Sequence, residues 1–546
     1  MRAGARTARL VCRFTTRFSY PETAMILLRS ANALLLLLLC TSSLPAQHDR
    51  ERNAVRHIAS GDVDKALAQL EKGEAASSET HFVRMLAALE AKKTDQAVVH
   101  ARAALDAGLP FGRLVAGPRD RLAPLYATDQ YRQWARQNDS LQLLHGPMLG
   151  AISSDSASLW LRTAKKGSVQ VRVLDARSGK LISTSEQVAA SEHTDFTAVA
   201  RLTGLEADHS YRYEIEVDGM QVPVENGQFQ TFPQQGTAAS FRVGFGGGAG
   251  FVPKWEYMWD TVLESRPVAF LMLGDNVYID DPTHPLTNHY CYHRRQSRPE
   301  WRRFTAATGI YSIYDDHDFG LNDCIPGAEI EHPAWKRSVW KTFRQNWVNA
   351  SYGGGEIQPG CWQDFYIGDV HFILLDGRYY RSRDGDPTML GPVQKKWLLE
   401  TLEKSKGTFK VLASPVPWTA GVKPGSKDTW DGYSQEREEI FSFLEAKGIN
   451  GVFLVAADRH RTDLRVTSRP DGYDLYEFES SRLTNRHTHK VIETPGLIWG
   501  YNKTCSFALM RFDTTAADPT VTFEAITIDG EKVHSHQLKL SQLTHK

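Results

Sequence analysis

Three short segments of this sequence carry side chains that could bind metal ions. Carboxylate oxygens and imidazole nitrogens are ordinary ligands of catalytic ions. A phenolate can bind a hard, highly charged ion. Each segment directly follows an apolar run, so each is expected at the end of a buried strand. The segments are Gly274-Asp275-Asn276-Val277-Tyr278, Tyr314-Asp315-Asp316-His317-Asp318 and Ala457-Asp458-Arg459-His460.

The first segment could supply two metal ligands. The carboxylate of Asp275 can bridge two cations, and Tyr278, three residues further on, can add a phenolate. Gly274 lets the chain turn sharply after the apolar run and present Asp275 at the edge of the sheet. Taken alone, a turn in which Asp275 acts only as a cap is an equally good interpretation.

The second segment places four ionisable side chains in a row at 315–318. Such charge is costly after a buried strand unless something compensates for it, and a metal ion is the natural compensation. His317, between carboxylates, would be a tuned acid or base. A solvated acidic loop is the alternative, and the apolar run that leads into the segment disfavours it.

The third segment pairs a carboxylate with an imidazole. Asp458 and His460 alternate at a predicted strand end, so both side chains can point the same way. An Asp-x-His pair is common, and its value lies in being a third strand end with metal-type donors. Three such sets at one edge predict a two-metal site, in which paired cations clamp a phosphate, activate a water and stabilise the leaving oxygen.

The elements that must position these residues alternate along the carboxyl-terminal part of the chain. Continuous apolar runs indicate strands buried on both faces, and helices are expected between them, one of them capped by Ser434. This alternation predicts an α/β layer domain whose ligand site lies outside the carboxyl ends of the strands. The expected strands are 268–273, 310–314, 372–375, 411–413 and 452–457, and the expected helices are 335–347, 392–404 and 435–447.

Two further regions precede this domain. Alternating polar and apolar residues between 146 and 232 predict short half-buried strands, and hence a small immunoglobulin- or fibronectin-like β-sandwich over 146–235. Residues 47–145 look helical, and the similar blocks 64–67 and 95–98 are typical of a tetratricopeptide-like repeat. This extension could dock a protein partner, although a packing extension is the favoured interpretation.

Composition and the amino terminus limit the surroundings of the protein. Its 546 residues exceed one ordinary core and predict two or three domains. Basic and acidic residues both number 64, and this zero formal charge predicts no specific nucleic-acid binding. Arg29, the apolar run 31–40 and the small residues after it are typical of a signal peptide over 1–46, with Met25 as an alternative start. The run is too short to span a bilayer, so a periplasmic or extracellular protein is expected.

Four cysteines remain after the expected leader. In an exported protein they could form one or two disulfides, or they could remain half-buried thiols, and the sequence is compatible with both. They are Cys291, Cys324, Cys361 and Cys505.

The ordered motifs resemble the PhoD-like alkaline phosphatases, a branch of the calcineurin-like metallophosphatases. The similar stretches are 146–150, 159–162, 274–278, 315–323, 430–433 and 458–460. The resemblance covers roughly 146–535, and the phosphatase domain is expected over 240–546. It implies an α/β fold with a four-layer αββα core and a dinuclear centre of iron and calcium. It further implies hydrolysis of phosphomonoesters or phosphodiesters by a metal-bound hydroxide.

The resemblance also implies a role for each candidate residue. His317 would protonate the leaving oxygen. Arg378 and Arg459 would contact the phosphate, the alternative for both being a surface or interface cation. The implied metal ligands are Asp275 as the bridge, Tyr278 on the ferric-type ion, Asp316 on the second metal, and Asp458 and His460 to complete the coordination.

One departure from the family pattern concerns the first metal. The family usually places a Cys ligand at the end of the first core strand. Here the strand at 243–245 leads into the glycine-rich segment 246–250, and no Cys lies nearby. The glycines could form a backbone nest for phosphate or a permissive turn, and the turn is slightly favoured. The identity of the first metal is therefore open.

Two other functions are considered, and the missing thiolate motivates the first of them. A non-catalytic descendant would keep the fold and bind a phosphorylated ligand or a partner. A different metal hydrolase would act on sulfate or lactone esters. His487 and His489 could reach the site, but a mobile loop is the favoured interpretation of this segment.

Overall fold

The computed structural model describes residues 49–72 and 77–545. Residues 49–546 cluster as one compact unit. The signal peptide expected over 1–46 lies outside the described residues. Within the described ranges, no helix is both long and apolar enough to cross a membrane. Because 49–546 form one unit, the domain limits expected at 145 and 235 remain predictions.

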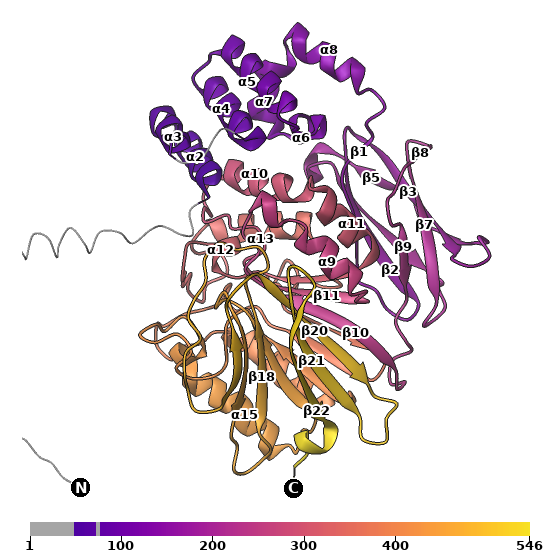
Figure 1. Cartoon of the computed structure of the whole chain (residues 1–546), viewed down its shortest axis with the longest axis vertical. Helices are drawn as coiled ribbons and strands as arrows, with labels where there is room; N and C mark the ends of the chain where they lie inside the picture. Colours follow the sequence, from indigo (N-terminus) through magenta and orange to yellow (C-terminus); the bar gives the residue numbers. More distant parts are fainter. Residues whose placement is uncertain (1–48, 73–76, 546) are drawn as a thin grey trace, which may run out of the picture. The chain divides into compact units, whose positions relative to one another are not determined.

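Two β-sheets pack against each other in the carboxyl-terminal part of the chain (Figure 1). The first has nine strands in the order β22-β21-β20-β10-β11-β12-β1-β2-β6, and β10, β11 and β12 are parallel. Phe523 of this sheet stacks on Phe478 of the second sheet, with ring centroids 4.6 Å apart. The strands from this part of the chain are β10 (Ser240–Gly246), β11 (Ala269–Leu273), β12 (Gly309–Ile313), β20 (Ser506–Asp513), β21 (Thr520–Thr527) and β22 (Lys532–Lys539).

The second sheet has seven strands in the order β13-β14-β15-β16-β18-β17-β19, and β14, β15, β16 and β18 are parallel. Every residue of β11, β12, β14, β15 and β16 is buried, which explains why these strands appear as continuous apolar runs. The strands are β13 (Gln363–Ile367), β14 (Val370–Leu374), β15 (Phe409–Ala413), β16 (Val452–Ala456), β17 (Thr462–Thr467), β18 (Leu475–Ser480) and β19 (Leu497–Tyr501).

Helices flank both sheets, so the predicted α/β layer arrangement is confirmed. On the first sheet, Phe304 of α11 meets Phe270 of β11 edge to face, with ring centroids 5.4 Å apart. The helices α14 and α15 pack together beside the second sheet (Figure 1). The helices are α9 (Met258–Glu264), α10 (Pro285–Gln296), α11 (Pro299–Ala307), α12 (Asp316–Phe319), α13 (Trp335–Asn346), α14 (Gly391–Lys404) and α15 (Ser434–Ala446).

The expected cap of α15 is wrong. The helix begins at Ser434 itself, and neither Ser434 nor Tyr433 caps it through a side chain. A short 3₁₀ turn, Trp430–Tyr433, leads directly into the helix. The start of the helix is therefore set by this turn, and a side-chain cap is not used.

Three of the strands before residue 240 extend the first core sheet. Strand β1 pairs in parallel with β12 at Gly150 and Ile310. Strands β2 and β6 continue the sheet, because β2 pairs with β1 and β6 pairs with β2. A separate sheet in the order β4-β3-β7-β8, with β5 and β9 at its sides, holds the alternating buried residues. The strands are β1 (Leu143–Gly150), β2 (Ser156–Thr163), β3 (Gly167–Asp175), β4 (Leu181–Thr184), β5 (Val188–Ala190), β6 (Thr197–Thr203), β7 (Ser210–Val217), β8 (Met220–Val222) and β9 (Gln228–Gln230).

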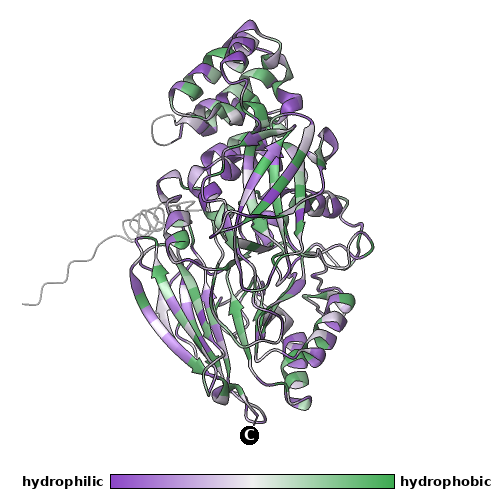
Figure 2. Cartoon of the chain, turned by 90° about the vertical axis from the view of Figure 1, so that its right-hand side faces the viewer, coloured by the Kyte–Doolittle hydropathy of each residue, from purple (hydrophilic) through white to green (hydrophobic). Residues whose placement is uncertain are grey.

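Seven helices fill the described residues before β1. Helix α2 packs on α3 and α4 packs on α5, and the repeated blocks 64–67 and 95–98 fall in α3 and α5. The helices at the top of Figure 2 mix hydrophobic and hydrophilic residues, as amphipathic helices do. They are α2 (Arg50–Ala59), α3 (Val63–Leu70), α4 (Ser78–Glu90), α5 (Thr94–Asp106), α6 (Phe111–Ala116), α7 (Arg119–Tyr126) and α8 (Asp129–Gln137).

Candidate metal centre

The loop after β11 is held in a strained conformation. Gly274 has a φ of +100°, and a Cβ at this position would lie 2.9 Å from the backbone nitrogen of Asp315, so a side chain cannot fit. Asp275 and Tyr278 follow with φ values of +54° and +52°. Such backbone strain in residues other than glycine persists only where the surroundings enforce it, and it gathers at functional sites.

The carboxylate of Asp318 enforces this loop. Its two oxygens accept hydrogen bonds from the backbone nitrogens of Asn276 and Val277, both at 2.9 Å. The Asn276 side chain in turn donates to the carbonyl of Ile313 in β12 at 2.8 Å. Burial raises the pKa of Asp318 to about 6, against the lowering effect of the backbone N–H groups. Asp318 therefore connects the first and second sequence segments.

Replacing Asp318 by alanine should destabilise the protein. The change leaves two buried backbone N–H groups without acceptors, at about 1–3 kcal/mol each. Chemical denaturation would measure the loss in the free energy of unfolding, and the exposed Asp471→Ala would serve as the control. An unchanged unfolding midpoint would show that the loop does not need this carboxylate.

Asp275, Tyr278 and His460 converge in the buried interior. The Tyr278 hydroxyl donates to Asp275 Oδ2 at 2.9 Å and lies 2.7 Å from His460 Nε2. His460 Nε2 is 3.8 Å from Asp275 Oδ2. Asp275 Oδ1 and His460 Nδ1 are buried and have no hydrogen-bond partner among the residues of the described ranges. Because buried polar atoms are almost always paired, these atoms suit a cation ligand set.

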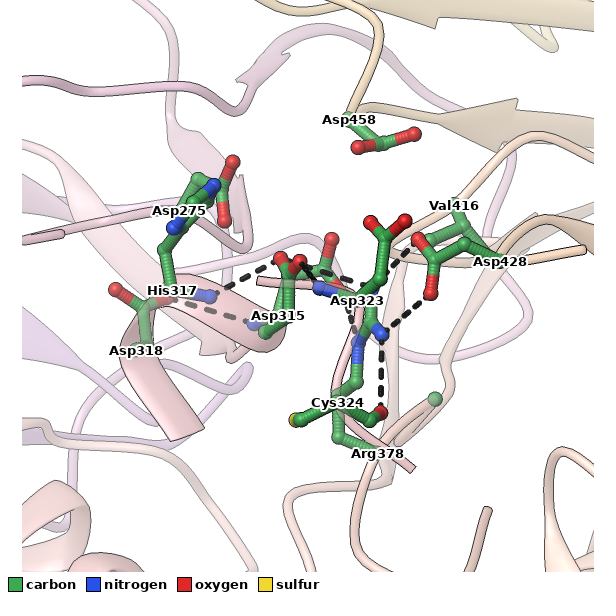
Figure 3. Close-up of polar contacts among 12 residues, drawn as sticks. Asp275, Asp315, His317, Asp318, Asp323, Cys324, Arg378, Val416, Asp428 and Asp458 are labelled. Atoms are coloured by element: carbon green, nitrogen blue, oxygen red, sulfur yellow. Dashed lines mark hydrogen bonds and ion pairs between the residues drawn. The ribbon is translucent and has the colours of Figure 1, made fainter. Parts of the chain in front are cut away.

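A second group of donors adjoins the first through Asp275. Ligand atoms of Asp275, Asp316 and His317 all lie within 4.8 Å of one another, and so do those of Asp316, Asp323 and Asp428. Asp275 is thus shared between an imidazole–phenol side and a carboxylate side. Figure 3 shows Asp275, His317, Asp323 and Asp428 around this region.

The electrostatics of the centre favour added positive charge. Burial raises the pKa of Asp275 well above its usual value, and Asp316 and Asp315 raise it further against the effect of His317. Burial would also raise the pKa of Asp316, but Arg378 and His317 outweigh it and lower that pKa. A cation between these carboxylates would relieve their repulsion. The residues present therefore fit a metal centre.

Asp458 and His460 do not alternate along a strand. Both lie in the bend after β16, with φ values of +71° and +46°, so they are not part of an extended strand. Asp458 Oδ2 lies 3.7 Å from the amine of Lys423 and 3.5 Å from Arg459 Nη1. The predicted alternation at a strand end was wrong, because the strand stops at Ala456.

Lys423 links Asp458 to the carboxylate side of the centre. Its amine is 3.0 Å from Asp323 Oδ1 and 3.3 Å from Asp428 Oδ2. In the sequence, Asp323 stands out only as part of a motif, and Asp428 and Lys423 do not stand out. The only signal for Asp428 was its place two residues before Trp430, at the start of the matching stretch 430–433.

The guanidinium of Arg378 pairs with buried carboxylates. Its side chain is fully buried, Nε donates to Asp315 Oδ1 at 2.5 Å, and the two terminal nitrogens donate to Asp428 at 2.7 and 3.1 Å (Figure 3). Burial raises the pKa of Asp315 to about 8 in spite of Arg378. This arrangement favours a role in holding the acidic residues rather than the predicted phosphate contact. Arg459 is different, because its buried Nε has no partner within the described part of the chain.

The glycine-rich segment behaves as a turn. The backbone nitrogens of Gly247, Gly248 and Ala249 donate to the carbonyls of Ser480, Gly274 and Asp275 at 3.1, 3.3 and 2.8 Å. These N–H groups are therefore used within the protein and do not form a nest for phosphate. All four cysteines of the described residues are free, and none belongs to a metal-type cluster there.

His487 and His489 lie beside His460. Each ring centroid is 5.4 Å from that of His460, and the three residues offer nitrogens within 4.8 Å of one another. Burial, followed by Arg459, lowers the pKa of His489 to about 3, so its imidazole is neutral near neutral pH. The expectation of a mobile loop therefore missed an imidazole cluster, and the His-x-His spacing was the signal that could have found it.

Comparison with solved structures defines the class of fold. The chain is similar to a structure titled "Structure of PhoD", with a TM-score of 0.60 and 17% identity, covering 72% of this chain and 93% of that one. It is also similar to the purple acid phosphatase PPD1 from yellow lupin (Lupinus luteus) seeds, with a TM-score of 0.55 and 11% identity, covering 73% and 75%. The fold is therefore of the metallophosphatase type.

Sequence comparison then gives the family. The family model "PhoD-like phosphatase" matches residues 244–492, and a domain of unknown function (DUF7800) matches residues 140–236. Alkaline phosphatase D of Bacillus subtilis (strain 168) is 25% identical over 239 residues, which span 37% of this chain and 40% of that protein. Residues 244–492 thus match the PhoD-like phosphatase family, and the resemblance seen in the motifs is confirmed.

Proposed function

We propose that this protein is an exported, metal-dependent phosphoesterase that hydrolyses phosphomonoesters or phosphodiesters at a dinuclear centre. The observation that supports it best is the shared position of Asp275, between the phenol and imidazole of Tyr278 and His460 on one side and Asp316 on the other. The leader-like segment 1–46 supports export to the periplasm or outside the cell.

The two sides of Asp275 suit different ions. A phenol and an imidazole suit a transition metal such as iron, and a set of carboxylates suits a hard ion such as calcium. Tyr278 and His460 would hold the first ion, and Asp316 the second. Asp458 would complete the carboxylate side, where Lys423 lies close to it. Bound cations would polarise the phosphorus centre and make a water molecule more acidic.

The remaining residues would bind and protonate the substrate. Asp280 accepts a hydrogen bond from His317 Nδ1, so proton donation to the leaving oxygen falls to Nε2. Arg459, with its unpartnered buried Nε, is the better placed arginine for a phosphate oxygen. Arg378 would act by fixing Asp315 and Asp428.

Removal of metal tests the proposal directly. The purified protein should contain metal by elemental analysis and release phosphate or phenol from aryl phosphomonoesters or phosphodiesters. Chelation should abolish turnover, and added metal should restore it, because the buried carboxylates need compensation for their charge. Full turnover by metal-free protein would refute metal dependence.

The missing thiolate favours a second candidate, a metal-binding protein that holds a phosphorylated ligand without hydrolysing it. Bound metal with no turnover, across several metals and substrates, would support this candidate. Turnover of sulfate or lactone esters in the same panel, without phosphoester turnover, would instead point to a different hydrolase.

A further inference from the structure

We propose that Arg52, in helix α2, is a positioning residue that acts on His317 through Asp280. Helix α2 lies outside both matched regions, which begin at residues 140 and 244. The inference rests on the proposed function, because it assigns Arg52 a part in protonating the leaving group. It gives the amino-terminal helices a use at the site that the family resemblance does not cover.

A continuous chain of polar contacts joins the two residues. Arg52 Nη1 forms an ion pair with Asp280 Oδ2, and the other oxygen of Asp280 accepts a hydrogen bond from His317 Nδ1. Arg52 Nη1 also lies 3.3 Å from the carbonyl oxygen of Tyr278. The guanidinium therefore reaches both the loop that carries a metal ligand and the carboxylate that orients the imidazole.

The backbone ties the same loop to His317. The backbone nitrogens of Ile279 and Asp280 donate to the His317 carbonyl at 2.8 and 3.0 Å. Asp280 has a φ of +52°, a conformation that needs support from its surroundings. His317 also stacks on the ring of Tyr278, with centroids 4.6 Å apart. A small movement of Asp280 would therefore displace the imidazole of His317.

Burial makes the pairing obligatory. The side chains of Arg52 and Asp280 are only 3% and 14% exposed. Because an unpaired buried charge is strongly disfavoured, the ion pair with Arg52 holds the Asp280 carboxylate in one orientation. A carboxylate fixed in this way holds an imidazole with one nitrogen bonded and the other presented to the substrate.

Helix α2 is itself anchored next to the site. Asp49 caps the helix by accepting a hydrogen bond from the backbone nitrogen of Arg52 at 3.0 Å, and its second oxygen pairs with Arg294 of α10. Phe82 of α4 stacks on Tyr290 of α10, with ring centroids 6.2 Å apart. The amino-terminal helices thus present Arg52 from a fixed support.

The test compares Arg52→Met, Arg52→Lys and the matched control Arg56→Met in the full, metal-loaded protein. Arg56 lies in the last turn of the same helix. The substrates are 4-nitrophenyl phosphate, whose leaving group needs little protonation, and phenyl and alkyl phosphates, whose leaving groups need much. General acid catalysis contributes about 10²–10⁴-fold, so partial loss of position should lower kcat for the poor leaving groups by about 10–100-fold.

The expected pattern is selective. Arg52→Met should leave the metal content, KM and turnover of 4-nitrophenyl phosphate close to those of the unmodified protein. Arg52→Lys should recover most of the lost turnover, and Arg56→Met should change nothing. An equal loss on all substrates would show a merely structural role and overturn the inference, as would unchanged turnover on every substrate.

Asp280→Asn provides a second, independent variant. It should show the same dependence on the leaving group, and adding Arg52→Met to it should cause little further loss, because both changes act on one contact. Additive losses would contradict the inference. If Arg52→Met does not fold, Asp280→Asn alone carries the test.

A spectroscopic measurement separates this inference from the proposed function. Side-chain ¹⁵N NMR of histidine-labelled protein, assigned with a His317 variant, should show a hydrogen-bonded Nδ1–H that shifts in Arg52→Met and not in Arg56→Met. This result does not require turnover. An unchanged His317 signal in Arg52→Met would sink the positioning role even in an active enzyme, and an inactive protein with the expected shifts would sink only the proposed function.

Discussion

Asp275→Ala is expected to lose both bound metal and phosphoester hydrolysis, with kcat/KM falling by about 10³-fold or more. The ions that Asp275 would hold would stabilise the charge of the transition state by several kcal/mol. Asp275 lies within reach of both donor groups in the described structure. Elemental analysis and steady-state kinetics on the same preparation would measure the two losses. Full activity in Asp275→Ala would overturn the assignment of the centre.

Substituting Asp275 should lower activity but raise the free energy of unfolding of the metal-free protein. Burial raises the pKa of Asp275 well above its usual value, so the folded metal-free protein binds this proton more tightly than the unfolded chain does. That contribution is present below the usual carboxyl pKa and is lost as the pH rises towards the raised folded-state value. Asp275→Asn should therefore make metal-free protein more stable at neutral pH and flatten its pH dependence, as chemical denaturation would measure.

These opposite effects on activity and on stability distinguish loss of metal from loss of fold. If Asp275 were a structural cap, Asp275→Asn would lower the unfolding free energy of metal-free protein instead of raising it. The exposed Asp471→Asn is a suitable control, because it removes the same charge away from the site. A variant that is stable, metal-poor and inactive would meet every expectation.

The elements that carry the site could be predicted because their apolar runs are continuous. The strands β11, β12 and β16 are buried on every residue, so their sequences stop being apolar where the functional loops begin. The convergence itself was misjudged in one respect. The donors do not share one sheet edge, since β11 and β12 belong to the first sheet and β16 belongs to the second. The pairing of two sheets depends on packing that a local pattern does not encode.

The residues that sequence reasoning missed come from segments with no periodicity. Asp428 and Lys423 lie in an irregular stretch between β15 and α15, where burial cannot be inferred from the sequence pattern. Arg52 is one of three arginines on an amphipathic helix, and such side chains usually face solvent. Only the folded chain reveals that its charge meets Asp280, more than 200 positions away in the sequence.

Arg378 shows the opposite difficulty. A conspicuous arginine near a predicted phosphate site suggests a ligand contact, yet this guanidinium is fully buried between Asp315 and Asp428. Buried carboxylates need a compensating positive charge, and Arg378 supplies it to Asp315 and Asp428. The sequence suggested a phosphate contact or a surface cation for Arg378, and its carboxylate partners could be identified only from the structure.

His317→Ala is expected to keep its metal and lose about 10²–10⁴-fold in kcat, the usual contribution of general acid catalysis. Asp280 holds Nδ1 of His317, and its pairing with Arg52 fixes that contact, so the ring is oriented as a proton donor. The loss should be larger for alkyl phosphates than for 4-nitrophenyl phosphate, because the poorer leaving group depends more on protonation.

Metal content decides between two roles for this side chain. A ligand atom of His317 also lies within 4.8 Å of those of Asp275 and Asp316, so an imidazole that binds an ion is the competing interpretation. Loss of metal in His317→Ala, with equal loss of turnover on all leaving groups, would make it a ligand. Retained metal with selective loss would make it the acid, and the exposed His193→Ala should leave both measurements unchanged.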